Sequence, residues 1–313
     1  YEPAFLHGAL TDAGYAVEMV DDESLARGVA KAAFDVVFLT QAHTTTRARR
    51  AIADWVTRDG GTLVALPGAG ARDEVDRPVT DLDAILGVTK RADGQGRLPP
   101  IVPGTAGYTL AGSLTAAPSR SLPEEAVFQP PCERAGCRLG ELVVNDAEVV
   151  ARLGTSAGIT RKAHPSGGVA YAYAFFPGLQ HWLALEGRSV AALPETTSPA
   201  PRVWASLPAQ DAERRKPSDA FRHARTSVPG VEAAVVRSTK GVAIVLFNWT
   251  GRPLPQGSVD VTLLGHDTFA LAFHGDLSAL TPRRTADGTT VTVPLETVDV
   301  VRLCHRTFDP ECR

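Results

Sequence analysis

Residues 35–40 read Asp-Val-Val-Phe-Leu-Thr, and residues 60–74 read Gly-Gly-Thr-Leu-Val-Ala-Leu-Pro-Gly-Ala-Gly-Ala-Arg-Asp-Glu. The two apolar runs predict buried parallel strands, and the segment 45–58 between them predicts an amphipathic helix. The glycine-rich turn after the second strand lies where open α/β sheets place their chemistry. Enzymes built this way carry Cys or Ser on that turn. Residues 67–71 are Pro, Gly, Ala, Gly and Ala, and none of these side chains is a nucleophile.

The spacing of hydrophobic residues along the chain predicts two domains joined by a linker. Strands alternating with helices predict a flavodoxin-like, doubly wound parallel sheet over residues 1–189. Residues 190–220 are rich in proline and carry mixed charge, which predicts an interdomain linker with little structure of its own. From residue 221 to 313 the period changes to two, and strands at short spacing predict a small antiparallel β-sandwich.

Composition narrows the classes of partner. The chain has 313 residues, 44% of them hydrophobic, and a formal net charge of -3. This charge favours neither a nucleic acid nor a membrane as partner, and no apolar run approaches the roughly 20 residues of a membrane span. No motif predicts a cofactor. The residues from Tyr1 onward do not have the sequence pattern of a signal peptide, and we expect the chain to be a C-terminal piece of a longer polypeptide.

Four cysteines form two pairs that are close in sequence, Cys132 with Cys137 and Cys304 with Cys312. Two local disulfides are one interpretation, and they would suit an exported protein. Four unpaired thiols are the second interpretation. A zinc site built from both pairs is the third, although the Cys-x4-Cys spacing fits zinc poorly. We expect no metal site.

Polar residues gather at the predicted rim above the two parallel strands. His43 follows the first strand, and Arg72, Asp73 and Glu74 follow the glycine-rich turn. A histidine and carboxylates can perform acid–base chemistry, but no nucleophile for His43 to activate is evident. The alternative is that these residues brace the loop or contact a neighbouring subunit. The helix over 45–58 is expected to expose its arginines, Arg49 among them.

Aromatic residues supply a second set of candidates. Trp182 and Trp249 could stack against sugars, whose apolar ring faces pack on aromatic side chains. The residues Tyr171, Tyr173 and Phe175 alternate along one strand and therefore share a face. That pattern is also typical of the buried face of a sheet, and we expect these three side chains to belong to the core.

These segments resemble a known family. The stretch 35–74 is similar to the trimerisation domain of family 42 β-galactosidases, which is itself similar to class I glutamine amidotransferases that have lost the catalytic cysteine. Two later segments, 151–178 with its Phe-Phe-Pro-Gly corner and 241–251 with its Gly-Val-Ala-Ile-Val-Leu-Phe-Asn-Trp-Thr-Gly run, look like the end of that domain and the small β domain that follows. The segment 94–140 departs from the family's pattern.

The resemblance implies a non-catalytic accessory region of a carbohydrate-active enzyme. The family's two catalytic glutamates lie in an N-terminal (β/α)8 barrel of about 250 residues, which this chain has no segment to supply. No catalytic residue is therefore carried over. The implied partner is a second copy of the chain, as in a homo-trimer, or an upstream barrel of the same polypeptide. Two alternatives remain open: an amidotransferase-like hydrolase with a site around His43, Arg72 and Asp73, and a carbohydrate-binding module that uses the aromatic residues.

Overall fold

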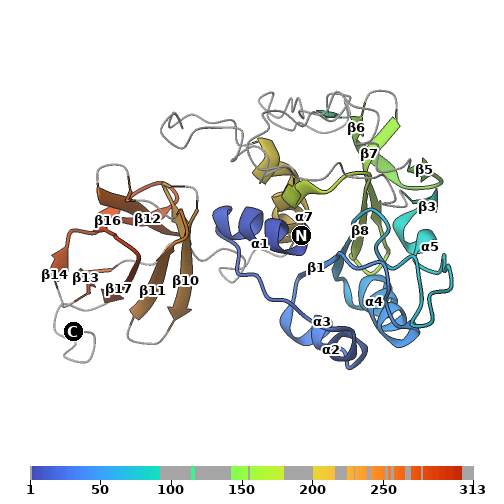
Figure 1. Ribbon diagram of the computed structural model, residues 1–313, viewed down its shortest axis with the longest axis horizontal. Helices are drawn as coiled ribbons and strands as arrows, with labels where there is room; N and C mark the ends of the chain where they lie inside the picture. The colour runs from blue at the N-terminus through green and yellow to red at the C-terminus, as the bar shows by residue number, and fades with distance from the viewer. Residues whose placement is uncertain are drawn as a thin grey trace. The chain divides into compact units, whose positions relative to one another are not determined.

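The computed structural model describes residues 2–91, 114–116, 142–153, 156–179, 200–215, 224–228, 230–237, 241–250, 253–254, 257–264, 269–275 and 278–304. Figure 1 traces their path. The chain divides into two compact units, which are described separately. The α/β unit comprises Tyr1–Leu6 with Met19–Arg215, and the β unit comprises His7–Glu18 with Lys216–Arg313.

The α/β unit is built on a six-stranded sheet with mixed strand directions (Figure 1). Its strands β1, β2 and β8 run parallel to one another, and β7, β6 and β4 continue the sheet in antiparallel fashion. In sheet order the strands are β1 (Val36–Leu39), β2 (Thr62–Ala65), β8 (Val169–Tyr173), β7 (Ser156–Ala163), β6 (Glu148–Leu153) and β4 (Leu114–Ala116). A small antiparallel pair, β3 (Val88–Lys90) with β5 (Val143–Val144), lies beside it.

The expected parallel sheet is therefore only half right. A tight turn reverses the chain between β7 and β8: the His164 N–H donates to the Gly168 carbonyl over 2.8 Å, and the Gly167 N–H donates to the His164 carbonyl over 2.9 Å. A turn this short can join only antiparallel neighbours, because parallel strands need a long crossover connection. The prediction of parallel strands holds for β1, β2 and β8, and it is wrong for the other half of the sheet.

Helix α4 (Thr46–Asp59) forms because its sequence supplies both end signals and one apolar stripe. The Thr45 side chain accepts a hydrogen bond from the Ala48 N–H, and Gly60 ends the helix at a φ of 81°. Its stripe includes Trp55, which packs so closely on Gly61 that a Cβ there would lie 2.1 Å from the indole ring. Among the described residues, the other helices are α1 (Glu2–Asp12, divided between the two units), α2 (Asp22–Ala26), α3 (Val29–Ala33), α5 (Asp83–Leu86) and α7 (Ala200–Arg215).

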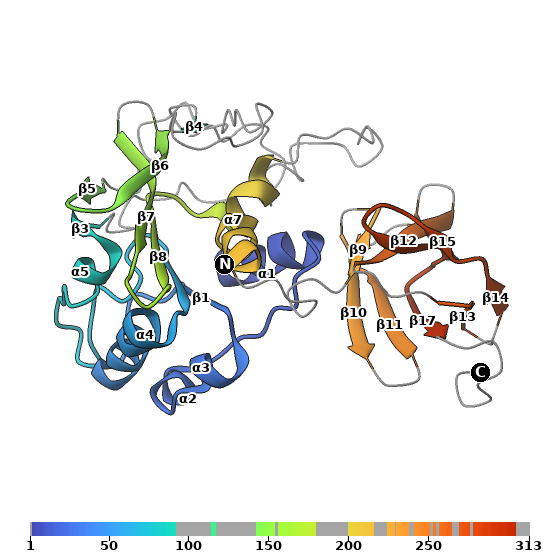
Figure 2. The same cartoon turned by 180° about the vertical axis from the view of Figure 1, so that it is seen from behind.

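Helix α7 corrects the prediction of an unstructured linker over 190–220. It packs on β1 and β2, and Figures 1 and 2 show α7 and α4 on opposite sides of the sheet. The helix buries Ala205, Leu207, Ala209 and Ala212. Asp211 fixes it to the sheet by accepting hydrogen bonds from the Tyr171 hydroxyl over 2.7 Å and from Arg161 Nε over 3.0 Å. The proline content suggested a linker, but these buried positions stabilise a helix.

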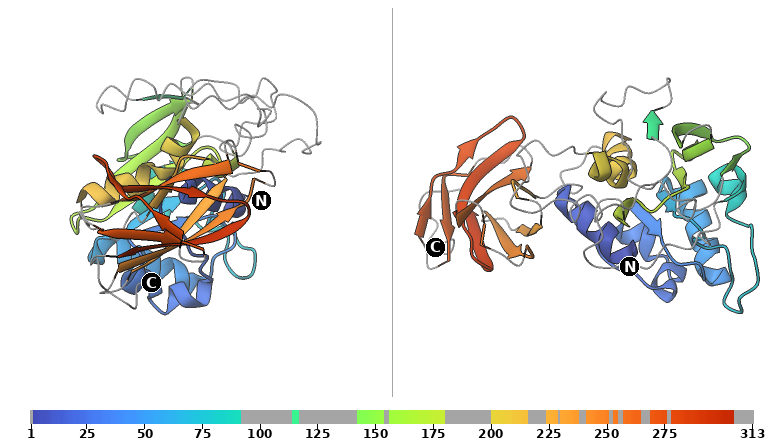
Figure 3. Two further views of the ribbon diagram at one scale, coloured as in Figure 1. Left: turned by 90° about the vertical axis from the view of Figure 1, so that its left-hand side faces the viewer. Right: turned by 45° about the horizontal axis from the view of Figure 1, so that its top comes forward.

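The β unit contains two antiparallel sheets, as the period of two predicts (Figure 3). One sheet has the order β10-β11-β17-β13-β14, and the other has the order β15-β16-β12-β9. The strands are β9 (Ala224–Thr226), β10 (Val231–Arg237), β11 (Gly241–Asn248), β12 (Ser258–Leu264), β13 (Leu271–His274), β14 (Ser278–Leu280), β15 (Arg283–Arg284), β16 (Gly288–Pro294) and β17 (Val298–Cys304).

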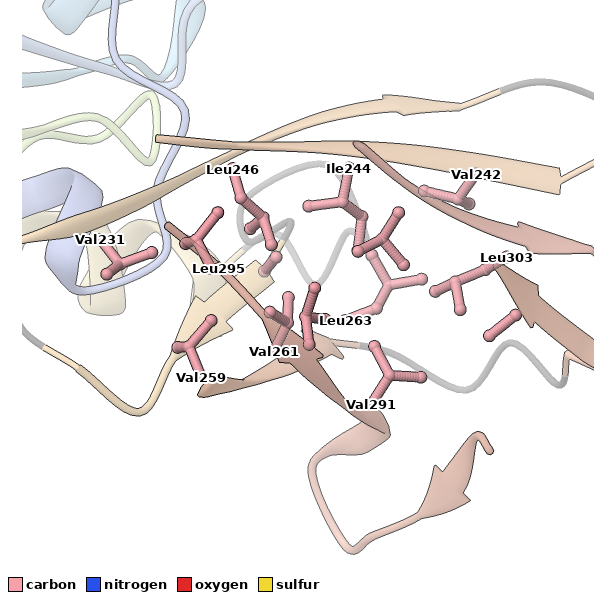
Figure 4. Packing of buried hydrophobic residues seen from close by; sticks show 14 of the residues in the cluster. Val231, Val242, Ile244, Leu246, Val259, Val261, Leu263, Val291, Leu295 and Leu303 are labelled. Atoms are coloured by element: carbon pink, nitrogen blue, oxygen red, sulfur yellow. The ribbon is translucent and has the colours of Figure 1, made fainter. Parts of the chain in front are cut away.

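Alternate residues of these strands meet in one hydrophobic core. Figure 4 shows Ile244 and Leu246 of β11 facing Val261 and Leu263 of β12, with Leu303 of β17 beside them. All five side chains are buried. Burial of this kind contributes about 1.5 to 3 kcal/mol per large aliphatic side chain. In the described part of the chain, no helix is long and apolar enough to cross a membrane.

Candidate functional site

The turn after β2 is buried and leaves no room for a catalytic side chain at its centre. The Gly70 N–H donates to the Gln41 carbonyl over 2.8 Å, which ties the turn to the chain beyond β1. Gly68 and Gly70 have φ angles of 73° and 62°, which glycine adopts without strain. A Cβ on Gly70 would lie 2.7 Å from Leu39 Cδ2. The close packing requires glycine here, where an enzyme of this architecture would carry its nucleophile.

Arg91 covers the carbonyl side of this turn. Its Nη1 donates to the Ala69 carbonyl, and its Nη2 donates to the Gly70 carbonyl over 3.3 Å. Its Nε forms an ion pair with Asp83 Oδ1 at 2.5 Å, and the two side chains are 7% and 13% exposed. Burial raises the pKa of the Asp83 carboxyl, although the Arg91 charge beside it acts in the opposite direction. A nearly buried ion pair therefore covers the turn that follows β2.

The predicted rim residues His43 and Arg72 meet at one carboxylate, that of Asp76. His43 Nε2 lies 2.8 Å and Arg72 Nη1 lies 3.1 Å from Asp76 Oδ1. The hydrogen bond from His43, followed by the charge of Arg72, holds the pKa of Asp76 below its usual range. Asp76 has a φ of 65°, an uncommon conformation for a residue other than glycine. Asp76 was not predicted from the sequence, in which its only local signal is its position four residues after Arg72.

Asp73 and Glu74 brace backbone rather than converge on a common point. Asp73 Oδ1 accepts hydrogen bonds from the Arg77 N–H over 2.8 Å and from the Val75 N–H over 3.0 Å. Glu74 Oε2 accepts one from the Thr46 N–H over 3.0 Å. The pKa of Asp73 is lowered chiefly by the Arg77 N–H, and that of Glu74 is lowered by its own N–H and that of Thr46. The loop 73–77 is thereby fixed.

Arg49 is buried beneath the loops that carry His43 and Arg72. The prediction that it lies on the exposed face of α4 is therefore wrong. Its side chain is 3% exposed, and its Nε lies 2.9 Å from Asp81 Oδ2. Its Nη1 donates to the Thr44 carbonyl and lies 3.5 Å from the Arg72 carbonyl. A buried guanidinium is stable only when it is paired in this way. The single charge of Arg49 therefore connects the loops that follow β1 and β2.

The hydroxyl that follows His43 in the sequence is not accessible as a nucleophile. The hydroxyl next to His43 belongs to Thr44, whose side chain is 1% exposed and whose Oγ1 has no hydrogen-bond partner among the described residues. A buried hydroxyl on a packed turn cannot reach a substrate. Within the described ranges, no group of three or more His, Cys, Asp or Glu side chains is placed to hold a metal ion.

The other sequence candidates have separate locations. Tyr171, Tyr173 and Phe175 are fully buried in the α/β unit. Trp249 is exposed on the β unit, whereas Trp182 lies outside the described residues. Cys304 at the end of β17 is disulfide-bonded. Its predicted partner, Cys312, lies outside the described residues, as do Cys132 and Cys137, so both pairings stay predictions.

Three solved structures of β-galactosidases are similar in fold to this chain. A catalytic mutant of Gan42B, a GH42 β-galactosidase from G. stearothermophilus, matches with a TM-score of 0.55 at 13% identity over 97% of this chain and 36% of its own. The β-galactosidase from Rahnella sp. has the same TM-score at 16% identity, with 96% and 36% covered. That from Bacillus circulans sp. alkalophilus gives 0.54 at 15%, with 96% and 37% covered.

These TM-scores establish a likeness of fold between this chain and part of a GH42 β-galactosidase, whereas the sequence identities are low. The chain spans about a third of the length of each of the three structures. No protein-family model and no curated protein matches the sequence.

Proposed function

We propose that this chain is a non-catalytic accessory region of a glycoside hydrolase of the β-galactosidase type, and that its α/β unit mediates subunit assembly. The observation that carries the proposal is the closed turn, where Gly70 has no space for a side chain and Arg91 covers the carbonyl groups. The fold likeness to β-galactosidases supports the enzyme class. The catalytic carboxylates of the parent enzyme would belong to a part of the polypeptide outside this chain.

The finer identity we propose is a trimerisation-type domain of amidotransferase-like, flavodoxin-related architecture. The parallel strands β1, β2 and β8 and the helices α4 and α7 on opposite sides support this assignment. The scaffold keeps the turn that positions a nucleophile in amidotransferases, with glycine and alanine in its place. Loss of the nucleophile together with close packing of the turn favours an assembly role over chemistry.

We place the assembly surface at the loop 73–77 and the adjacent His43, which together are called the rim surface. Val75 is 59% exposed at the tip of this loop, and its backbone N–H is held by Asp73. Because the loop is already fixed, it loses little conformational entropy when it is buried. Arg72 forms an ion pair with Asp76, and His43 Nε2 lies 2.8 Å from the same carboxylate, so that the carboxylate stays paired when the surface is buried in an interface.

The alternative is an amidotransferase-like hydrolase with its site around His43. The His43 side chain is 59% exposed and is therefore accessible to a substrate from solvent. The neighbouring hydroxyl of Thr44 is buried, however, and the His43 ring is engaged by Asp76. This second function would require a nucleophile from a substrate or from water.

Sedimentation equilibrium of the whole chain tests the assembly role. We expect reversible self-association that is weakened by Val75→Asp, because an unpaired charge would be buried at the tip of the loop. The matched control is Val143→Asp, which changes an exposed valine of β5 in the same unit and should leave association unchanged. A chain that stays monomeric at all concentrations would contradict the assembly role.

Assays with an aryl β-galactoside and with glutamine test the non-catalytic role. We expect no turnover of either substrate by this chain. Turnover that is abolished by His43→Ala would overturn the proposal in favour of the hydrolase.

A further inference from the structure

One face of the β unit exposes apolar side chains that its core does not use. Strands β10, β11 and β17 are neighbours in one sheet. The residues that alternate with their core residues lie on the face of this sheet opposite to the core that Figure 4 shows. We define the outer face as the following residues of these strands and of the residue after β11: Glu232, Ala234, Val236, Ala243, Val245, Phe247, Trp249, Val298, Val300 and Arg302. Contiguous exposed apolar surface of this kind commonly marks a binding site.

The largest side chain of the outer face is held in one orientation. Trp249 is 69% exposed, yet its ring stacks on Phe247 with a centroid distance of 5.7 Å and an interplanar angle of 16°. Its Nε1 donates a hydrogen bond to Glu232 Oε2 over 2.9 Å. Its backbone N–H donates to the Gly230 carbonyl over 2.9 Å. The exposed indole is thus fixed before any ligand arrives, which lowers the entropy cost of binding.

The charges of the outer face favour a neutral ligand. Among its residues only Glu232 and Arg302 are charged, and they have opposite signs. The two charges lie at opposite ends of the outer face. Glu232 pairs with Phe247 near the end of β11, whereas Arg302 pairs with Ala243 near its beginning. A nucleic acid or an anionic surface would require a cluster of basic side chains. A neutral molecule with both apolar and hydroxyl groups fits this face better.

We propose that the outer face binds a neutral oligosaccharide, independently of the assembly role of the α/β unit. The Trp249 ring stacks against the apolar C–H face of a pyranose, and the Glu232 carboxylate beside it accepts hydrogen bonds from ring hydroxyls. Val245 and Phe247 are about 7 Å apart along β11, and Trp249 follows in the turn after the strand. The face therefore extends beyond a single sugar ring toward Val300 and Arg302.

Isothermal titration of the whole chain with β-1,4-galactotetraose and with cellotetraose tests the proposal. We expect binding of at least one of them and a loss of at least about tenfold in affinity for Trp249→Ala. Glu232→Ala should also weaken binding, because it removes a hydroxyl acceptor and releases the indole. The matched control is Met19→Ala, which removes another large exposed side chain from the α/β unit and should bind like the unchanged chain.

The outcomes separate this proposal from the assembly role. A urea-unfolding midpoint unchanged in Trp249→Ala shows that the variant is folded, as expected for so exposed a side chain. Equal affinity in Trp249→Ala, or no binding of either oligosaccharide at millimolar concentration, overturns the proposal. A loss of self-association in Trp249→Ala would also overturn it, because the outer face would then be a contact between copies. Val75→Asp should bind the oligosaccharide normally.

Discussion

Arg91 Nε lies 2.5 Å from Asp83 Oδ1, and this nearly buried ion pair closes the turn at which an α/β enzyme would carry its nucleophile. The guanidinium also binds the turn's carbonyl groups. Arg91, paired with Asp83, therefore holds the turn in its packed conformation.

Removing Arg91 should destabilise the chain strongly. Arg91→Ala leaves the Asp83 carboxylate without its counter-charge, and breaking a buried pair in this way costs about 3 to 5 kcal/mol. The measurement is the free energy of unfolding in urea. The control is Arg58→Ala, which breaks an exposed pair with Asp54 on α4 and should cost about 0.5 kcal/mol or less. Equal costs for the two variants would show that the turn does not depend on Arg91.

The contact between α7 and the sheet should depend on Asp211. Asp211→Ala removes the acceptor of both Tyr171 and Arg161 and should cost about 3 to 5 kcal/mol. Tyr171→Phe removes one hydrogen bond to the carboxylate and should cost about 1.5 to 3 kcal/mol. Urea unfolding of both variants measures this difference. If Asp211→Ala proved the milder change, the ion pair would not hold the helix.

The stability of the chain should fall as the pH rises through the neutral range because of Glu2. Its carboxylate accepts hydrogen bonds of 2.7 Å from the N–H groups of Gly178 and Leu179. Burial outweighs these bonds and raises the pKa of Glu2 from 4.5 to about 8. Between these values the folded chain keeps a proton that the unfolded chain has lost, so that the free energy of unfolding decreases by about 1.4 kcal/mol per pH unit.

Comparison with Glu2→Gln isolates that contribution. The variant cannot ionise, and its unfolding free energy measured from pH 5 to pH 8 should lack this part of the slope. Identical slopes in the two proteins would mean that Glu2 ionises in the folded chain as it does in the unfolded one.

Two glycines should respond in opposite ways to the same substitution. Gly61→Ala places a methyl group 2.1 Å from the Trp55 ring, and overpacking of this kind costs about 1 to 3 kcal/mol or more. Gly8→Ala, in α1, meets nothing within 4 Å and should stabilise the chain by about 0.5 to 1 kcal/mol. Thermal unfolding of both variants measures the two shifts, and a stabilising Gly61→Ala would contradict the packing at this position.

Local signals in the sequence were sufficient for one part of the fold. The amphipathic pattern over 45–58 predicted α4 closely, and the period of two predicted the strands of the β unit. The proline content of 190–220 predicted a linker, whereas residues 200–215 form α7. The burial that stabilises α7 depends on partners such as Tyr171 that are distant in sequence.

The sequence also predicted only part of the candidate site, because the other part depends on contacts between residues that are distant in sequence. His43 and Arg72 were expected near one another because neighbouring parallel strands end at the same edge of a sheet, and the chain forms an isolated parallel bridge between them. Asp76, Arg49 and Arg91 were missed. Their roles depend on a loop conformation and on buried ion pairs, which a periodic hydrophobic pattern does not predict. The amphipathic pattern of 45–58 predicted an exposed Arg49, which is in fact buried.

Hydroxyl-radical footprinting of the chain across a dilution series tests the central claim most directly, since it reports side-chain exposure at the rim surface. The account predicts that Val75 and His43 are modified in dilute protein and become protected as the chain associates, while Val143 stays equally reactive throughout. Val75 and His43 that are modified to the same extent in the dilute and the associated protein would contradict assembly through the rim surface.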